Sequence, residues 1–148
     1  MTVEVAREAN CRELTDRDIE SAASAALEHG GRPEFALTVV LVDDPTLAEL
    51  HSRCLNDPSV TDVMSFDLSD EVSGPVGEVY VSVDRAREVA KRREVTVSRE
   101  LTLYVVHGTL HLCGFDDIDD EDRLAMRRAE SVVMERLGHH PDPLPHDE

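Results

Sequence analysis

Residues 105 to 117 read VVHGTLHLCGFDD, and this largely apolar run contains two histidines four residues apart. Side chains at i and i+4 of a helix leave it on one face, so the imidazoles of His107 and His111 can reach one ion. Apolar neighbours on both sides suggest that this face is partly buried. Buried histidines need polar partners, and a shared metal supplies them. The alternative is a pair of packed or surface histidines that hold no metal.

Gly114 and Asp117 favour the metal. Glycine adopts the positive φ angle that a sharp turn after a helix requires, and such a turn can bring a later residue back to the ion. The spacing His-x3-His-x2-Gly-x2-Asp follows the layout of metzincin zinc sites, in which a third histidine commonly stands last. Because a carboxylate is an acceptable zinc ligand, the spacing selects Asp117 as the third ligand. We expect the neighbouring acids to start the next helix.

Gly108 stands where zinc peptidases of the HExxH type carry their general base, a glutamate next to the first histidine. The usual peptidase chemistry is therefore disfavoured, and no other segment announces a base. A metal can still lower the pKa of bound water or polarise a phosphoryl oxygen. The motif thus predicts a metal site that is free to activate water or to bind a phosphoryl oxygen, and it leaves the general base unknown.

Outward from this motif, the chain of 148 residues predicts one α+β domain over residues 1–137, followed by a disordered tail at 138–148. Apolar periodicity and turn residues place four strands in a mixed sheet and about five helices. The expected strands are 3–7, 35–44, 61–68 and 76–83. The expected helices are 15–31 with Thr15 as cap, 45–55 with Asp44 as cap, 84–93, 97–114 and 119–137.

The formal net charge of −17 bears on function, since nucleic-acid binding normally draws on basic surface. Taken whole, the chain should repel RNA. Residues 85 to 99 depart from this pattern, with six basic residues against two acidic ones. This stretch is either a solvated helix face or a phosphate-binding patch. In the second case the candidate substrate contacts are Arg85, Arg87, Lys91 and Arg92.

The cysteines and the N-terminus indicate the compartment. Three widely spaced cysteines without a CxxC pair fit reduced thiols better than a disulfide scaffold. No apolar run approaches the roughly 20 residues of a membrane span, and MTVEVAREAN lacks the features of a signal peptide. We expect a cytoplasmic protein without a membrane partner.

Three segments carry a family resemblance. HGTLHLCGFDD at 107–117 resembles the signature HGxLHLxGyDH, TDVMSF at 61–66 resembles TDVLSF, and GEVYVSVDRA at 77–86 resembles a third family segment. In this order, they resemble the YbeY family of bacterial metal-dependent endoribonucleases. The chain departs from the family at Asp117, where the signature has histidine.

The resemblance implies an α+β fold with a zincin-like helix, one zinc ion and hydrolysis of single-stranded RNA. It also implies a role in 16S rRNA 3′-end maturation and ribosome quality control. The implied partners are ribosomal RNA, the small ribosomal subunit and ribosomal proteins, with no DNA. Asp117 as a ligand lowers the charge of the site by one unit relative to histidine and could shift metal preference towards harder divalent ions.

Two further residues are candidates for the catalytic machinery. Many family members carry an arginine six residues before the threonine of the second segment. Leu55 stands there in this chain, and the nearest arginine is Arg53, which could equally be an exposed helix residue. Glu100 lies seven residues before His107 and is either an acid supporting a ligand or half of a surface ion pair.

Two other functions stay open. One is a ribosome-assembly factor with a structural metal and little or no catalysis, and the other is a metallohydrolase of a different substrate.

Overall fold

The computed structural model describes residues 2–55, 62–116 and 118–139. These residues form four strands and five helices, which confirms the predicted α+β class. The strands are β1 (Thr2–Arg7), β2 (Ala36–Val42), β3 (Val63–Asp67) and β4 (Val76–Ser82). The helices are α1 (Asp16–His29), α2 (Asp44–Leu55), α3 (Val83–Arg93), α4 (Val97–Leu112) and α5 (Asp120–Arg136).

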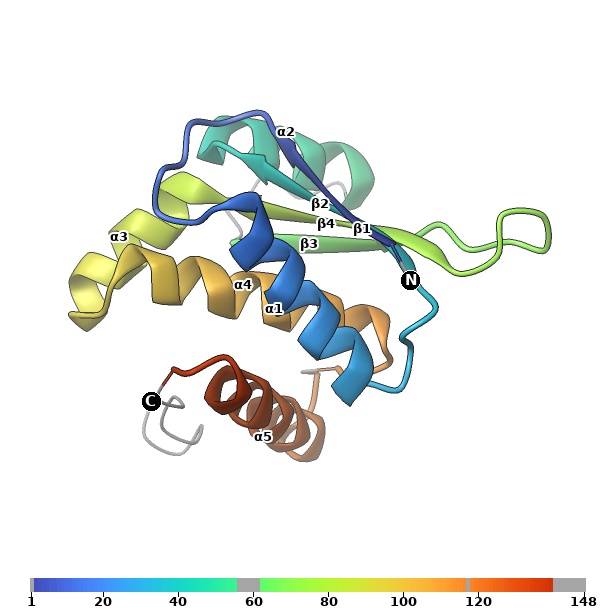
Figure 1. The fold of residues 1–148 in the computed structure, drawn as a ribbon. Coiled ribbons are helices and arrows are strands. Elements are labelled where there is room, and N and C mark those ends of the chain that lie inside the picture. The colour runs from blue at the N-terminus through green and yellow to red at the C-terminus, as the bar shows by residue number, and fades with distance from the viewer. Residues whose placement is uncertain (1, 56–61, 117, 140–148) are drawn as a thin grey trace.

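The sheet is mixed, with the strand order β1-β2-β4-β3 (Figure 1). Strands β1, β2 and β4 run parallel, and β3 pairs antiparallel with β4. The central strand β2 reads ALTVVLV, and most of its residues are buried. Such a nearly continuous apolar strand is typical of parallel sheets that are covered on both faces.

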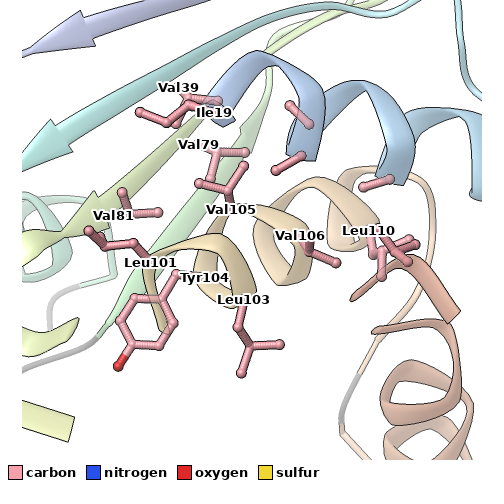
Figure 2. Packing of buried hydrophobic residues seen from close by; sticks show 14 of the residues in the cluster. Ile19, Val39, Val79, Val81, Leu101, Leu103, Tyr104, Val105, Val106 and Leu110 are labelled. Carbon is pink, nitrogen blue, oxygen red and sulfur yellow. The ribbon is translucent and has the colours of Figure 1, made fainter. Parts of the chain in front are cut away.

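Helices cover both faces of the sheet (Figure 1). Helix α2 lies on one face, over a small apolar cluster that includes Val40, Val42 and Leu47. Helices α1 and α4 lie on the other face, and α4 is itself covered by α5. Figure 2 shows the main core, in which residues of α4 such as Val105 meet Val79 of the sheet. The helix that carries both histidines is therefore the central helix of the fold.

The helix ends follow the expected capping chemistry with one exception. Thr15 caps α1 in a capping box with Asp18, as side chains of this kind do at helix N-termini. The prediction that Asp44 caps α2 is wrong. The carboxylate of Asp43 accepts the backbone N–H of Thr46 at 2.8 Å, and Asp44 already belongs to the helix. Two successive aspartates offered two caps, and the earlier one is used.

The chain continues in an ordered turn beyond Leu137. Gly138 has a φ of 90°, and the backbone N–H of His139 donates to the carbonyl of Met134 at 2.9 Å. The predicted tail therefore begins with two placed residues, and its remainder, 140–148, lies outside the described residues. Across the described ranges, no helix is long and apolar enough to cross a membrane.

Candidate metal centre

Helix α4 ends as its sequence predicts. Gly114 has a φ of 104°, and the backbone N–H of Phe115 reaches back to the carbonyl of Leu110 at 3.1 Å. This 6→1 hydrogen bond with a left-handed glycine is the Schellman motif. The turn at Gly114 is thus confirmed, and it follows directly after the helix face that carries His111.

Both histidines have their Nδ1 atoms engaged. Nδ1 of His107 lies 2.5 Å from Oε2 of Glu130, and Nδ1 of His111 lies 3.1 Å from the carbonyl oxygen of Phe115. A carboxylate and a carbonyl are both acceptors, so each Nδ1 carries the proton and donates. The Nε2 lone pair of each neutral ring is then the one that can bind a metal. Metal-ligating histidines usually donate their other nitrogen in this way, and the two residues therefore fit a metal.

The third predicted ligand, Asp117, lies outside the described residues. Within residues 2–55, 62–116 and 118–139, no group of three or more His, Cys, Asp or Glu side chains is placed to hold an ion. The structure thus provides two imidazoles whose Nδ1 atoms are hydrogen-bonded and whose Nε2 atoms could bind a metal. Asp117 as the third ligand stays a prediction.

Glu130 is a candidate functional residue that the sequence pattern did not reveal. Its side chain is 3% exposed, and besides His107 it accepts a hydrogen bond from Nη1 of Arg127 at 3.0 Å. A signal was present, because Glu130 interrupts the apolar stripe of α5 between Met126 and Val133. A buried acid in such a stripe needs a partner, and here the partners are an arginine and a candidate metal ligand.

A cavity of about 310 Å³ opens beside His107, where α3, α4 and α5 face the start of β3. Its charged lining comprises Asp62, Arg85, Arg92, Arg93, Glu100, Arg127 and Glu130. Arg93 is bonded to Glu100 and Arg127 to Glu130, so four of these charges form two ion pairs. Two arginines remain against one aspartate. Among the described residues that line it, the cavity therefore carries a local positive charge, in a chain whose net charge is −17.

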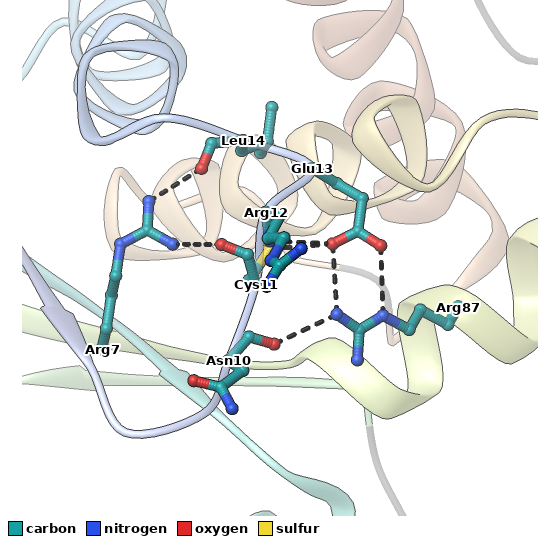
Figure 3. A network of polar contacts seen from close by, with 7 residues as sticks. All are labelled: Arg7, Asn10, Cys11, Arg12, Glu13, Leu14 and Arg87. Atoms are coloured by element: carbon teal, nitrogen blue, oxygen red, sulfur yellow. Dashed lines mark hydrogen bonds and ion pairs between the residues drawn. The ribbon is translucent and has the colours of Figure 1, made fainter.

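The four predicted substrate contacts divide between two sides of α3. Arg85 and Arg92 stand at i and i+7 and both line the cavity. Lys91 is exposed and is not among the lining residues. Arg87 turns to the other side, where it bonds Glu13 and the carbonyl of Asn10 (Figure 3). The helix period thus brings half of the predicted patch to the histidine.

The contact between Glu13 and Arg87 is electrostatically strong. Hydrogen bonds from Arg87, opposed by partial burial, lower the pKa of Glu13 to about 2. Both residues border a second cavity of about 860 Å³, formed largely by the loop after β1. The guanidinium of Arg87 therefore holds this loop against α3.

Glu100 and Arg53 have different surroundings. Glu100 is 1% exposed, and both its carboxylate oxygens accept from Nη1 of Arg93, so the ion pair considered for it is buried at the carboxylate and partly exposed at the arginine. Arg53 is exposed on α2, 4.0 Å from Glu49, across the sheet from α4 (Figure 1). The structure brings Glu100 to the cavity and leaves Arg53 away from it.

Gly108 packs against the sheet, and its environment explains the missing glutamate. A Cβ atom there would lie 2.5 Å from Cγ1 of Val79 and 2.9 Å from Cγ2 of Val63. Both distances are far below van der Waals contact. The hydroxyl of Ser65 also donates to the carbonyl of Gly108 at 2.8 Å. A side chain at position 108 would force the sheet or the helix to shift, so a base next to His107 in the HExxH manner is sterically disfavoured.

Comparison with known proteins shows the family to which the chain belongs. The family model described as Endoribonuclease YbeY matches residues 4–138. Endoribonuclease YbeY of Finegoldia magna is 31% identical over 133 residues, 88% of this chain and 87% of its own length. The protein of that name from Rhodopirellula baltica is 38% identical over 130 residues, 86% of this chain and 67% of its own.

A solved structure shares the fold. The solution structure of a protein from Thermotoga maritima superposes with a TM-score of 0.63 at 24% identity, covering 92% of this chain and 89% of that one. With the family model spanning nearly all described residues and relatives above 30% identity, the chain belongs to the YbeY endoribonuclease family.

Proposed function

We propose that this protein is a metal-dependent hydrolase that cleaves single-stranded RNA internally. The observation that carries the proposal is a pair of imidazoles held through Nδ1, one of which, His107, lines a cavity with a locally positive set of described residues. The ligands would be His107, His111 and Asp117. Zinc suits two imidazoles and one carboxylate, and it leaves a fourth position for water or substrate. The names of the relatives support RNA as the substrate.

The groups of the chain have separate tasks in this proposal. A bound metal would supply Lewis acidity towards a phosphoryl oxygen or water. Arg85 and Arg92 bind backbone phosphates of the RNA, as arginines do in nucleic-acid sites. Glu130 holds the ring of His107 in one orientation and fixes its tautomer. No step requires a base at position 108.

We further propose that the substrate is the 3′ region of 16S rRNA, met in the cytoplasm on the small ribosomal subunit. Membership of the family supports this role. The net charge of −17 opposes the binding of free RNA. It therefore favours a substrate that the small ribosomal subunit holds in place for the protein. Ribosomal proteins that position the RNA would offset this repulsion.

The test is cleavage of a labelled single-stranded RNA, with DNA of the same sequence as control. Cleavage should require zinc, stop with a chelator and return when zinc is added back. It should fall by at least about 100-fold in His107→Ala and His111→Ala, because each removes a metal ligand. Arg53→Gln, on the far side of the sheet, is the matched control and should cleave normally. Chelator-insensitive cleavage, or none by the wild type and Asp117→His alike, would reject the nuclease proposal.

Asp117 itself favours a second candidate, a ribosome-assembly factor with a structural metal. An aspartate in place of the family histidine weakens the Lewis acidity of the ion, because the ligand is anionic. For this candidate, a chelator lowers the melting temperature while neither the wild type nor Asp117→His cleaves RNA. If Asp117→His cleaves much faster than the wild type, the substitution has reduced an existing activity.

A further inference from the structure

Tyr104 lines the same cavity as His107 and stands three residues before it on α4. The side chain is 5% exposed, yet its hydroxyl has no hydrogen-bond partner among the described residues. Figure 2 shows the ring at the edge of the core, with the oxygen turned away from Val81 and Val105. A buried hydroxyl without a partner destabilises the folded state, so its presence needs an explanation.

The surroundings of Tyr104 keep its hydroxyl neutral. Burial, followed by the nearby negative charges of Asp62 and Glu100, raises the pKa of Tyr104 well above its ordinary value, against the smaller effects of Arg85 and Arg93. A neutral phenol donates one hydrogen bond and also accepts. A buried donor and acceptor in one group thus belongs to a residue of the cavity wall, close to the first candidate metal ligand.

The charges around the cavity indicate what this group binds. Arg93 offsets the charge of Glu100, and Asp62 acts on the phenol more strongly than Arg85 does, so an anion is a poor partner for the phenol. Arg85 and Arg92 are the groups in the same cavity that suit phosphate. A neutral hydroxyl that both donates and accepts is the matching partner. In a nucleic acid this group is the ribose 2′-hydroxyl, which distinguishes RNA from DNA.

We propose that the hydroxyl of Tyr104 binds the ribose 2′-hydroxyl of a nucleotide in this cavity and so contributes to the selection of RNA over DNA. The inference rests on the proposed function, because it requires RNA to enter beside His107. It adds a specificity-determining contact that is separate from the metal ligands and from the arginines that bind phosphate.

Tyr104→Phe removes one oxygen and keeps the ring. Binding of a fluorescent single-stranded RNA and of DNA with the same sequence is measured in chelator, so that no cleavage occurs. The RNA affinity should fall about threefold to tenfold, as expected for one hydrogen bond, and the DNA affinity should not change. The melting temperature should stay level or rise, because the lost hydroxyl has no partner among the described residues.

Tyr80→Phe is the matched control. Tyr80 is the other tyrosine of the chain, lies under α2 on the opposite face of the sheet and donates its hydroxyl to Glu78 at 3.0 Å. Its loss should leave both affinities unchanged. A second set of RNAs, each with one 2′-deoxy position, should contain a position that weakens binding to the wild type and not to Tyr104→Phe.

The outcomes separate the inference from the proposed function. If the wild type binds RNA and Tyr104→Phe binds it equally well, the inference fails and the nuclease proposal stands. Equal losses for RNA and DNA assign Tyr104 to a phosphate or base and also overturn the inference. A wild type that binds no RNA in chelator overturns the inference, and the cleavage test with zinc then decides the nuclease proposal separately. If Tyr104→Phe does not fold, the deoxy series on the wild type decides, and the absence of a sensitive position rejects the inference.

Discussion

The carboxylate of Glu130 on α5 lies 2.5 Å from Nδ1 of His107 on α4. A candidate metal ligand and the acid that orients it thus come from two helices packed face to face. Because this acid fixes the ring and its tautomer, Glu130→Ala should lower zinc affinity about 10-fold to 100-fold. Competition with a chromophoric chelator measures this change without reference to RNA cleavage.

Glu130→Gln separates charge from geometry at this position. The amide oxygen still accepts from Nδ1, so the glutamine variant should recover part of the affinity that the alanine variant loses. Glu135→Gln, an exposed change on the same helix, is the control. Equal zinc affinity for the alanine variant and the wild type would show that Glu130 does not support the ligand.

Gly108 gives a prediction about stability. Gly108→Ala places a Cβ 2.5 Å from Cγ1 of Val79 and should cost about 1–3 kcal/mol through overpacking. Val79→Ala removes that methyl, so the double variant should be more stable than the sum of the two single effects predicts. Urea denaturation of the four proteins measures the coupling free energy. Additive losses would mean that the contact with Val79 does not cause the cost.

The two sides of α3 should differ in RNA binding. Arg85→Gln and Arg92→Gln remove charges that line the cavity, and each should reduce the slope of log affinity against log salt by about 0.7. Arg87→Gln removes the same charge from the same helix, but its guanidinium is bonded to Glu13. The Arg87 variant should keep the wild-type slope. Three equal reductions would instead indicate a diffuse field over the whole helix.

The ion pair between Glu13 and Arg87 predicts a pH dependence of stability. The pKa of Glu13 is lowered from 4.5 to about 2, so its contribution is complete above pH 4.5 and is lost as the pH falls towards 2. Both side chains are partly exposed, at 30% and 42%, and solvent screening limits the contribution to about 1 kcal/mol. Glu13→Gln should therefore be less stable than the wild type at pH 7, with the difference shrinking below pH 4.5. A difference that does not change with pH would exclude this origin.

The sequence predicted what depends on local pattern. The apolar stripe around His107 and His111 defined the helix, Thr15 defined a cap, and Gly114 defined the turn, since each acts through neighbours in the chain. Residues brought together by packing were missed. Glu130 joins His107 only because α5 crosses α4.

The sequence pattern was also insufficient to predict which side chains of α3 face the cavity. Six basic residues in one stretch do not reveal which of them face the cavity, and the structure divides Arg85 and Arg92 from Arg87. Nothing in the sequence singles out Tyr104, because its hydroxyl becomes unusual only once its surroundings are known.

The close approach of Gly108 to Val63 and Val79 has a consequence for mutational surveys. The sheet sets the depth and rotation of the helix that carries the candidate ligands, so the partly buried Val63 on β3 and the buried Val79 on β4 influence where the imidazoles stand. Apolar substitutions at these two positions should therefore reduce metal occupancy while the protein stays folded. Variants that would be classed as simple core defects would then impair function through the position of His107.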